Sequence, residues 1–247
     1  MSIACKWNWH NTGHQVWYDK STFETLKTTY PLYFYDDFLG SAGGSVFDST
    51  TIWQVEEVSV TTNVTTAIVA DSSGGHFLLH LTADAEVQDA ILYHNDNRTF
   101  NVDNGLIFET RVDIAVLPTL TGQAVVGMCG DTADDKDAIL ENAWFKWDGS
   151  GAVVVETDDT TNDNDDISTG VTTVPGTYNI FRIDFTTLAN VKFFIDGVRV
   201  ATGTTFDMSN LTGAELILQP YFSLDNDADA SLGDINIDYV KILSNRS

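Results

Sequence analysis

The sequence predicts an all-β protein, a sandwich of two antiparallel sheets. Short apolar or alternating runs recur about every 8–12 residues, with Gly, Asp and Asn between them. No long segment has the 3.6-residue period of an amphipathic helix. At 247 residues the chain has a size at which such sandwiches form single domains.

In the first half of the chain, strands are expected at residues 33–38, 52–58, 76–81, 90–93 and 105–114. The clearest is 105–114, because successive side chains of a strand point to opposite faces of the sheet. Its apolar face holds Leu106, Phe108, Thr110, Val112 and Ile114. The other face is polar and holds Glu109, Arg111 and Asp113.

In the second half, strands are expected at residues 124–128, 143–147, 152–155, 178–185, 216–224 and 234–243. Residues 191–202 should form a hairpin that turns at Asp196-Gly197. An Asp-Gly pair between alternating apolar residues favours a two-residue turn, since both turn positions require positive φ.

The composition excludes several partners. The net charge is −24, from 12 Lys and Arg against 36 Asp and Glu. Nucleic-acid binding needs cations to neutralise phosphates, so no nucleic-acid partner is expected, and no anionic membrane surface either. The first ten residues lack the apolar core of a signal peptide, and no run approaches the ~20 apolar residues of a membrane helix.

The cysteine content is low. Cys5 and Cys129 are the only two cysteines, and we expect two free thiols while leaving a bridge between them open. This usage suits a protein that folds in a reducing cytoplasm.

Residues 1–32 differ from the rest and are interpreted as an N-terminal arm before a body at 33–247. The arm is near neutral and rich in aromatics, and residues 23–29 have the length of one helical turn. Two alternatives stay open: it packs along its own sandwich, or it reaches a neighbouring subunit or another protein. The candidate partner-binding residues are Trp7, Trp9, Trp17, Tyr18, Phe23 and Tyr30.

Three acidic stretches, at 131–137, 158–166 and 225–229, are expected to be turns. Asp225, Asp227 and Asp229 have the spacing that opens an EF-hand loop and are weak calcium candidates. The loop pattern then fails, because Ala230 stands where glycine is required and Asn236 where a bidentate glutamate is required. A solvated turn is favoured, and no cofactor is expected, although calcium stays open.

No catalytic constellation is convincing, so we expect no enzyme activity. The nearest is Glu109 and Asp113 with Arg111 between them, but a cation there would lower both pKa values, the opposite of what a general acid needs. Ion-paired side chains on a polar strand face are favoured.

Carbohydrate binding needs exposed aromatic rings, and Trp53 and Trp144 are the candidate platform. Core packing is the favoured alternative for both. Trp144 and Trp147 must point to opposite faces of their strand.

Three C-terminal motifs carry a family resemblance: the Phe193-Phe-Ile-Asp-Gly197 hairpin, the Leu218-Gln-Pro-Tyr221 strand and the final Ile237-Asp-Tyr-Val-Lys-Ile242 strand. In this order they resemble the concanavalin A-like (laminin-G/glucanase) jelly roll. The resemblance implies a two-sheet jelly-roll sandwich, here preceded by an extended arm.

Further motifs narrow the resemblance. They are Tyr35-Asp36-Asp37-Phe38, the stretch Ala143-Trp-Phe-Lys-Trp-Asp-Gly-Ser-Gly151, and Val153-Val-Val-Glu-Thr157. Over about residues 33–243 the chain is similar to the concanavalin A-like domains of tailed-phage virion proteins, which have no fixed catalytic residues.

That likeness implies a virion structural protein, a capsid decoration or cement protein. It would be made in the host cytoplasm and located on the capsid surface, bound to the major capsid protein and to its own copies as a homotrimer or similar. The alternative is a lectin-like module that binds glycans, in a phage tail or head appendage.

Overall fold

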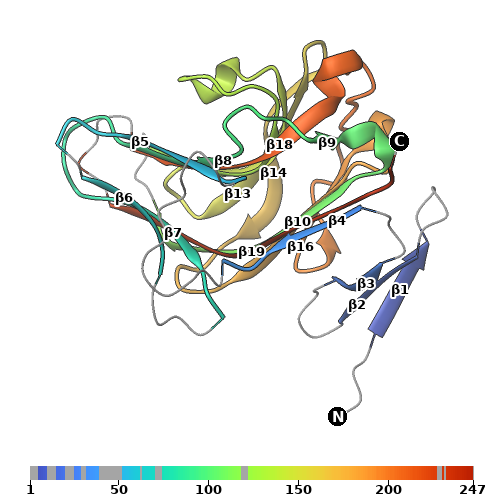
Figure 1. Ribbon diagram of the computed structural model, residues 1–247, viewed down its shortest axis with the longest axis horizontal. Coiled ribbons are helices and arrows are strands. Elements are labelled where there is room, and N and C mark those ends of the chain that lie inside the picture. The colour runs from blue at the N-terminus through green and yellow to red at the C-terminus, as the bar shows by residue number, and fades with distance from the viewer. Residues whose placement is uncertain are drawn as a thin grey trace.

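The computed structural model describes residues 32–38, 52–61, 63–69, 74–117, 122–226, 230 and 232–246, and the backbone of 5–9, 15–19 and 25–28. Two eight-stranded antiparallel sheets lie face to face and form a jelly-roll sandwich (Figure 1). Helical structure in the described residues is confined to short 3-10 turns. None of the described helices is long and apolar enough to cross a membrane.

One sheet, named here the β10 sheet, has the order β17-β16-β15-β10-β19-β7-β6, and β4 also pairs with β19. Its strands are β4 (Leu32–Asp36), β6 (Val64–Ile68), β7 (Phe77–Leu81), β10 (Ile107–Val116), β15 (Asn179–Asp184), β16 (Lys192–Ile195), β17 (Val198–Arg199) and β19 (Gly233–Ser244).

The other sheet, named the β11 sheet, has the order β14-β13-β12-β11-β18-β8-β5, and β9 also pairs with β18. Its strands are β5 (Gln54–Val58), β8 (Asp89–Tyr93), β9 (Phe100–Asn101), β11 (Gln123–Cys129), β12 (Glu141–Trp147), β13 (Ala152–Asp159), β14 (Asp163–Thr172) and β18 (Ile217–Asp225).

The core lies between the two sheets and is rich in aromatic rings. The Phe145 ring of one sheet meets the Phe181 ring of the other at 5.0 Å, edge to face, and Trp147 meets Phe181 at 5.2 Å. Edge-to-face packing is a favoured arrangement of aromatic rings. The alternation predicted for residues 105–114 is confirmed, because its apolar face is buried in this core.

The predicted hairpin is also confirmed. β16 and β17 pair antiparallel, and Asp196 and Gly197 join them with φ of 49° and 75°. Both turn residues therefore have the positive φ that the Asp-Gly pair predicted.

The acidic stretch 158–166 is not one turn, and that prediction is wrong. Asp158 and Asp159 end β13, Asp163 begins β14, and only residues 160–162 connect them. The Asp159 carboxylate explains the tight turn, since it accepts hydrogen bonds from the N–H groups of Thr161 and Asn162. The strand β6 was not predicted at all.

A separate three-stranded antiparallel sheet consists of β1 (Cys5–Trp9), β2 (Gln15–Asp19) and β3 (Thr25–Thr28). The helical turn expected at 23–29 is therefore wrong over Thr25–Thr28, while the interpretation of residues 1–32 as an arm stays a prediction. Thr25 and Thr28 are β-branched, which favours a strand. The side chains of Trp7, Trp9, Trp17 and Tyr18, and all of Phe23 and Tyr30, lie outside the described residues.

His94 is a buried histidine among aromatic rings. Its ring lies 4.6 Å from that of Trp53 and 6.0 Å from that of Phe34, centre to centre. Neither ring nitrogen has a hydrogen-bond partner among the described residues. Burial lowers the pKa of His94 to about 4, because a charged imidazole is poorly solvated there.

This predicts a loss of stability in acid. In the unfolded chain His94 is protonated below about pH 6.5, whereas in the folded chain it stays neutral down to about pH 4. The His94 contribution to the free energy of unfolding should therefore fall by about 3 kcal/mol between pH 6.5 and 4. Urea unfolding across this range should show a shallower pH dependence for His94→Leu than for the native chain. Equal slopes would show that His94 does not carry the effect.

Candidate functional site

The outer face of the β11 sheet carries polar side chains in register across three strands. Asp89 of β8 lies opposite Asp225 of β18, and Gln123 of β11 lies opposite Asp225 on the other side. Residues at directly opposed positions of antiparallel strands point to the same face. Two carboxylates are thus held side by side by the sheet itself.

The connection between β11 and β12, residues 130–140, stands over this face (Figure 1). Ile139 anchors it by packing in a small outer apolar cluster that includes Trp144 and Tyr221. A 3-10 turn, η2 (Lys136–Ala138), follows Asp135, whose side chain accepts the N–H of Asp137 and caps the turn. The connection thereby directs Lys136 down toward the sheet.

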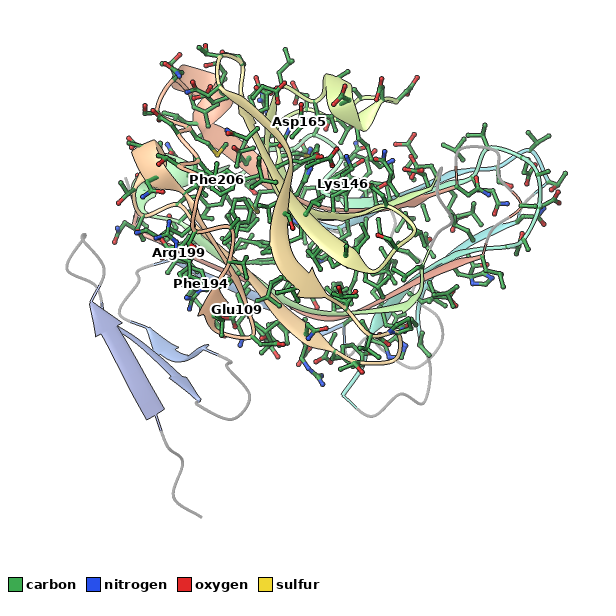
Figure 2. The ribbon with its side chains drawn as sticks, turned by 180° about the vertical axis from the view of Figure 1, so that it is seen from behind. Glu109, Lys146, Asp165, Phe194, Arg199 and Phe206 are labelled. Carbon is green, nitrogen blue, oxygen red and sulfur yellow. The ribbon has the colours of Figure 1, made fainter. Side chains whose placement is uncertain are left out.

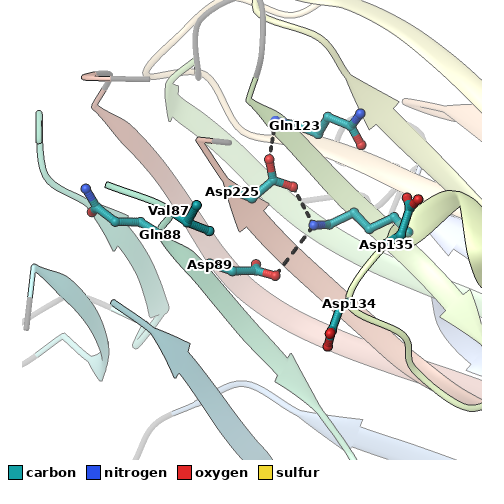
Figure 3. Close-up of a pocket in the computed structure, with 8 residues that line it drawn as sticks. Val87, Gln88, Asp89, Gln123, Asp134, Asp135 and Asp225 are labelled. Atoms are coloured by element: carbon teal, nitrogen blue, oxygen red, sulfur yellow. Dashed lines mark hydrogen bonds and ion pairs between the residues drawn. The ribbon is translucent and has the colours of Figure 1, made fainter. Parts of the chain in front are cut away.

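The ammonium of Lys136 lies between the two carboxylates (Figure 3). It donates to Asp225 Oδ2 and lies 3.6 Å from Asp89 Oδ2. All three side chains are largely buried, with exposed fractions of 9, 16 and 15 % for Lys136, Asp89 and Asp225. An ammonium so enclosed is stable only because it is paired.

Burial and mutual pairing shift the pKa values of Asp89 and Lys136. Burial raises the pKa of Asp89 to about 6, against the lowering influence of Lys136. Burial alone would lower the pKa of Lys136, but the two carboxylates outweigh it and hold that pKa above its ordinary value. Lys136 therefore stays charged at neutral pH, while Asp89 takes up a proton near pH 6.

Two adjoining cavities open on this face, of about 390 Å³ and about 500 Å³. They share Val87, Asp89 and Asp134. The first is also lined by Gln88, Gln123, Asp135, Lys136 and Asp225, and the second by Glu56, Val58, Ile91, Tyr93, Asp96, Thr132 and Ala133. The lining combines hydrogen-bonding carboxylates and amides with a few apolar and aromatic surfaces.

The tryptophan platform predicted from sequence is absent, because Trp53 and Trp144 are both buried, at 1 % exposure. Trp53 lies in the core between the sheets, where it contacts the ring of Phe38. Trp144 is covered on the outer face by the cluster of Ile139, and its indole N–H donates to Glu156 Oε2 at 2.7 Å. Trp147 points the other way, into the main core, as predicted.

Of the three calcium candidates, the structure describes only Asp225. Its carboxylate accepts hydrogen bonds from Lys136 and from the backbone N–H of Gln123, while Asp227 and Asp229 lie outside the described residues. In the part of the chain that the structure describes, no group of three or more His, Cys, Asp or Glu is placed to hold a metal. Lys136 was not among the residues predicted from the sequence, although a single lysine within the acidic stretch 131–137 was a usable signal.

The outer face of the β10 sheet is the second polar surface, and Figure 2 labels Glu109 there, away from Lys146 of the β11 sheet. Its ion pairs include those of Glu109 with Lys241 and of Arg111 with Asp238. Ion pairs therefore do form on this strand face, but the partners come from β19 and not from β10 itself. The lowered pKa expected for Asp113 is wrong, because burial raises the pKa of that carboxyl group.

The free thiol of Cys129 is buried in the outer cluster of the β11 sheet. Burial raises its pKa well above the usual range, so it is a poor nucleophile.

Comparison with solved structures confirms the concanavalin A-like fold. A pseudo β-1,3-glucanase and immunostimulatory antigen of Mycobacterium tuberculosis matches with a TM-score of 0.57 at 15% identity, covering 86% of this chain and 98% of that one. A structure described with endo-acting O-glycanases of the human gut microbiota matches with a TM-score of 0.56 at 14% identity, covering 86% and 99%.

A third similar structure is the potassium-bound carbohydrate recognition domain of Emp46p, with a TM-score of 0.53 at 12% identity, covering 86% and 96%. Searches for a matching family model and for a matching curated protein found none. Identities this low show a shared fold and leave the function to be argued from the site.

Proposed function

We propose that this chain is a carbohydrate-binding module whose site is the outer face of the β11 sheet. The observation that carries the proposal is the pair of adjoining cavities over β8, β18 and the 130–140 connection. Ligand sites are typically concave and hold a few placed polar groups among apolar ones.

The lining suits a sugar. Hydroxyl groups donate to carboxylates, and Asp134 and Asp135 are exposed carboxylates at the rim of the first cavity. The C–H faces of a pyranose need an apolar surface, and exposed Val87 offers one in the second cavity, beside the largely buried side chains of Ile91 and Tyr93. Proteins of the same fold whose names refer to glycans support this choice of ligand class.

We propose binding without hydrolysis. A glycosidase needs one protonated and one ionised carboxyl group flanking the scissile bond. Here the opposed pair Asp89 and Asp225 encloses the ammonium of Lys136, which occupies the space between them. Incubation of any bound oligosaccharide with the protein should release no new reducing ends.

Asp134→Asn should weaken glycan binding about tenfold, the loss typical of one charged hydrogen bond. Asp134 lines both cavities and is exposed, so folding should be unaffected. The measurement is a neutral-glycan array followed by calorimetric titration of any ligand found. Asp137→Asn is the matched control, since Asp137 is exposed on the same 130–140 connection and lines neither cavity. An array without ligands, or equal losses in both variants, would count against the proposal.

Capsid decoration is a second proposal, in which copies of the chain bind a capsid through residues 1–32. The observation in its favour is that β1, β2 and β3 pair only with one another and join neither large sheet. Light scattering should then give a defined oligomer for the full chain and a monomer for a chain that begins at Tyr33. Two equally folded monomers would remove the support for it.

A further inference from the structure

We infer that the ammonium of Lys136 is a built-in cation that fills a latent cation site between Asp89 and Asp225. A free cation, either a hard metal ion or a small amine, would take this site if the lysine charge were removed. The inference concerns the proposed binding face but does not depend on carbohydrate binding.

The site is built by the sheet and does not need the lysine to orient it. Asp89 and Asp225 are directly opposed on β8 and β18. The Ser223 hydroxyl donates to Asp89 Oδ1 at 3.0 Å, and the Gln123 backbone N–H donates to Asp225 Oδ1 at 3.2 Å. With each Oδ1 held, both Oδ2 atoms are directed at the ammonium.

In the native chain the position between the two carboxylates is filled by the Lys136 ammonium. Lys136 is a largely buried cation with a carboxylate oxygen on either side, and its stem descends from the 130–140 connection. Two carboxylates with room for water are ligands that hard cations prefer. The adjoining cavity of about 390 Å³ gives access to such an ion and its waters.

The built-in cation has a consequence for the native protein. Its binding face carries its own positive charge and requires no metal to hold the 130–140 connection against the sheet. A chelator should therefore change neither the thermal stability nor the ligand binding of the native chain.

The test is the Lys136→Met variant, whose side chain keeps the length of the stem without the charge. Its Tm should lie below that of the native chain and should rise saturably with calcium chloride, by about 5–10 °C at 100 times the Kd. Methylammonium chloride should also raise it. The native Tm should show neither saturable response.

Controls separate this site from general screening, since a chain of net charge −24 gains some stability from any salt. The triple variant Lys136→Met, Asp89→Asn, Asp225→Asn should lose the saturable response. Lys241→Met, which breaks the Glu109 pair on the other sheet, should show none. Lys136→Gln, a polar uncharged replacement, is measured in the same way in case the methionine variant does not fold. The inference is overturned if neither Lys136→Met nor Lys136→Gln shows a larger saturable rise in Tm than the triple variant and Lys241→Met.

Discussion

Replacing Lys241 by methionine is expected to lower the free energy of unfolding by about 3–5 kcal/mol, the cost of removing one charge of a buried ion pair. Lys241 Nζ lies 3.2 Å from Glu109 Oε1, and the two residues are 5 % and 1 % exposed. The Tyr239 hydroxyl also donates to Glu109 Oε1, at 3.1 Å, but a phenol cannot replace the ammonium charge. For a chain of this size the loss corresponds to a fall in Tm of about 10 °C.

The double variant Glu109→Leu, Lys241→Met is the informative comparison. Removing both charges also removes the cost of burying a carboxylate that has lost its ammonium, so the double variant should be more stable than Lys241→Met. Urea unfolding of the native chain and both variants measures this directly. A loss below about 1 kcal/mol for Lys241→Met would mean that water reaches the pair, as it does for exposed ion pairs.

Trp53→Ala should cost a similar amount, about 3–5 kcal/mol, because it removes a large buried ring and leaves a cavity. The Trp53 ring contacts Phe38 of the segment after β4, Phe222 of β18 and His94, at 5.7, 6.3 and 4.6 Å between centres. It therefore ties the N-terminal part of the sandwich to both sheets. Thermal unfolding should show a single cooperative transition at lower temperature.

Trp53→Phe separates packing from hydrogen bonding. The indole N–H donates to Asp36 Oδ2 at 2.9 Å, and phenylalanine keeps most of the apolar ring without this donor. We expect the phenylalanine variant to retain more than half of the stability that alanine loses. Equal losses would place the contribution of Trp53 in its hydrogen bond.

Local patterns predicted the sandwich well because side-chain alternation and turn chemistry depend only on residues near one another in the sequence. The face of Phe108 and Val112 is buried and the Asp196-Gly197 turn has positive φ, as alternation and turn chemistry require. The same reasoning failed at 158–166, where turn-forming residues lie within paired strands. There the register with β13 outweighs the local preference of Asp for turns.

The site was not predictable in the same way, because its parts meet only through the sheet order. Asp89 and Asp225 are far apart in sequence and become neighbours when β8 pairs with β18. Lys136 joins them only because the 130–140 connection crosses the outer face. Trp144 was a misleading candidate for a related reason, since the residues that bury it come from that connection and from β18.

Amide hydrogen exchange with and without an array-selected glycan tests the central claim most directly. If the outer face of the β11 sheet binds the glycan, exchange should slow in β8, in residues 130–140 and in the part of β18 near Asp225, and these effects should weaken in Asp134→Asn. Protection confined to β4, β10 and β19, on the outer face of the β10 sheet, would contradict the assignment of the site. The absence of any bound glycan would contradict the proposed function itself.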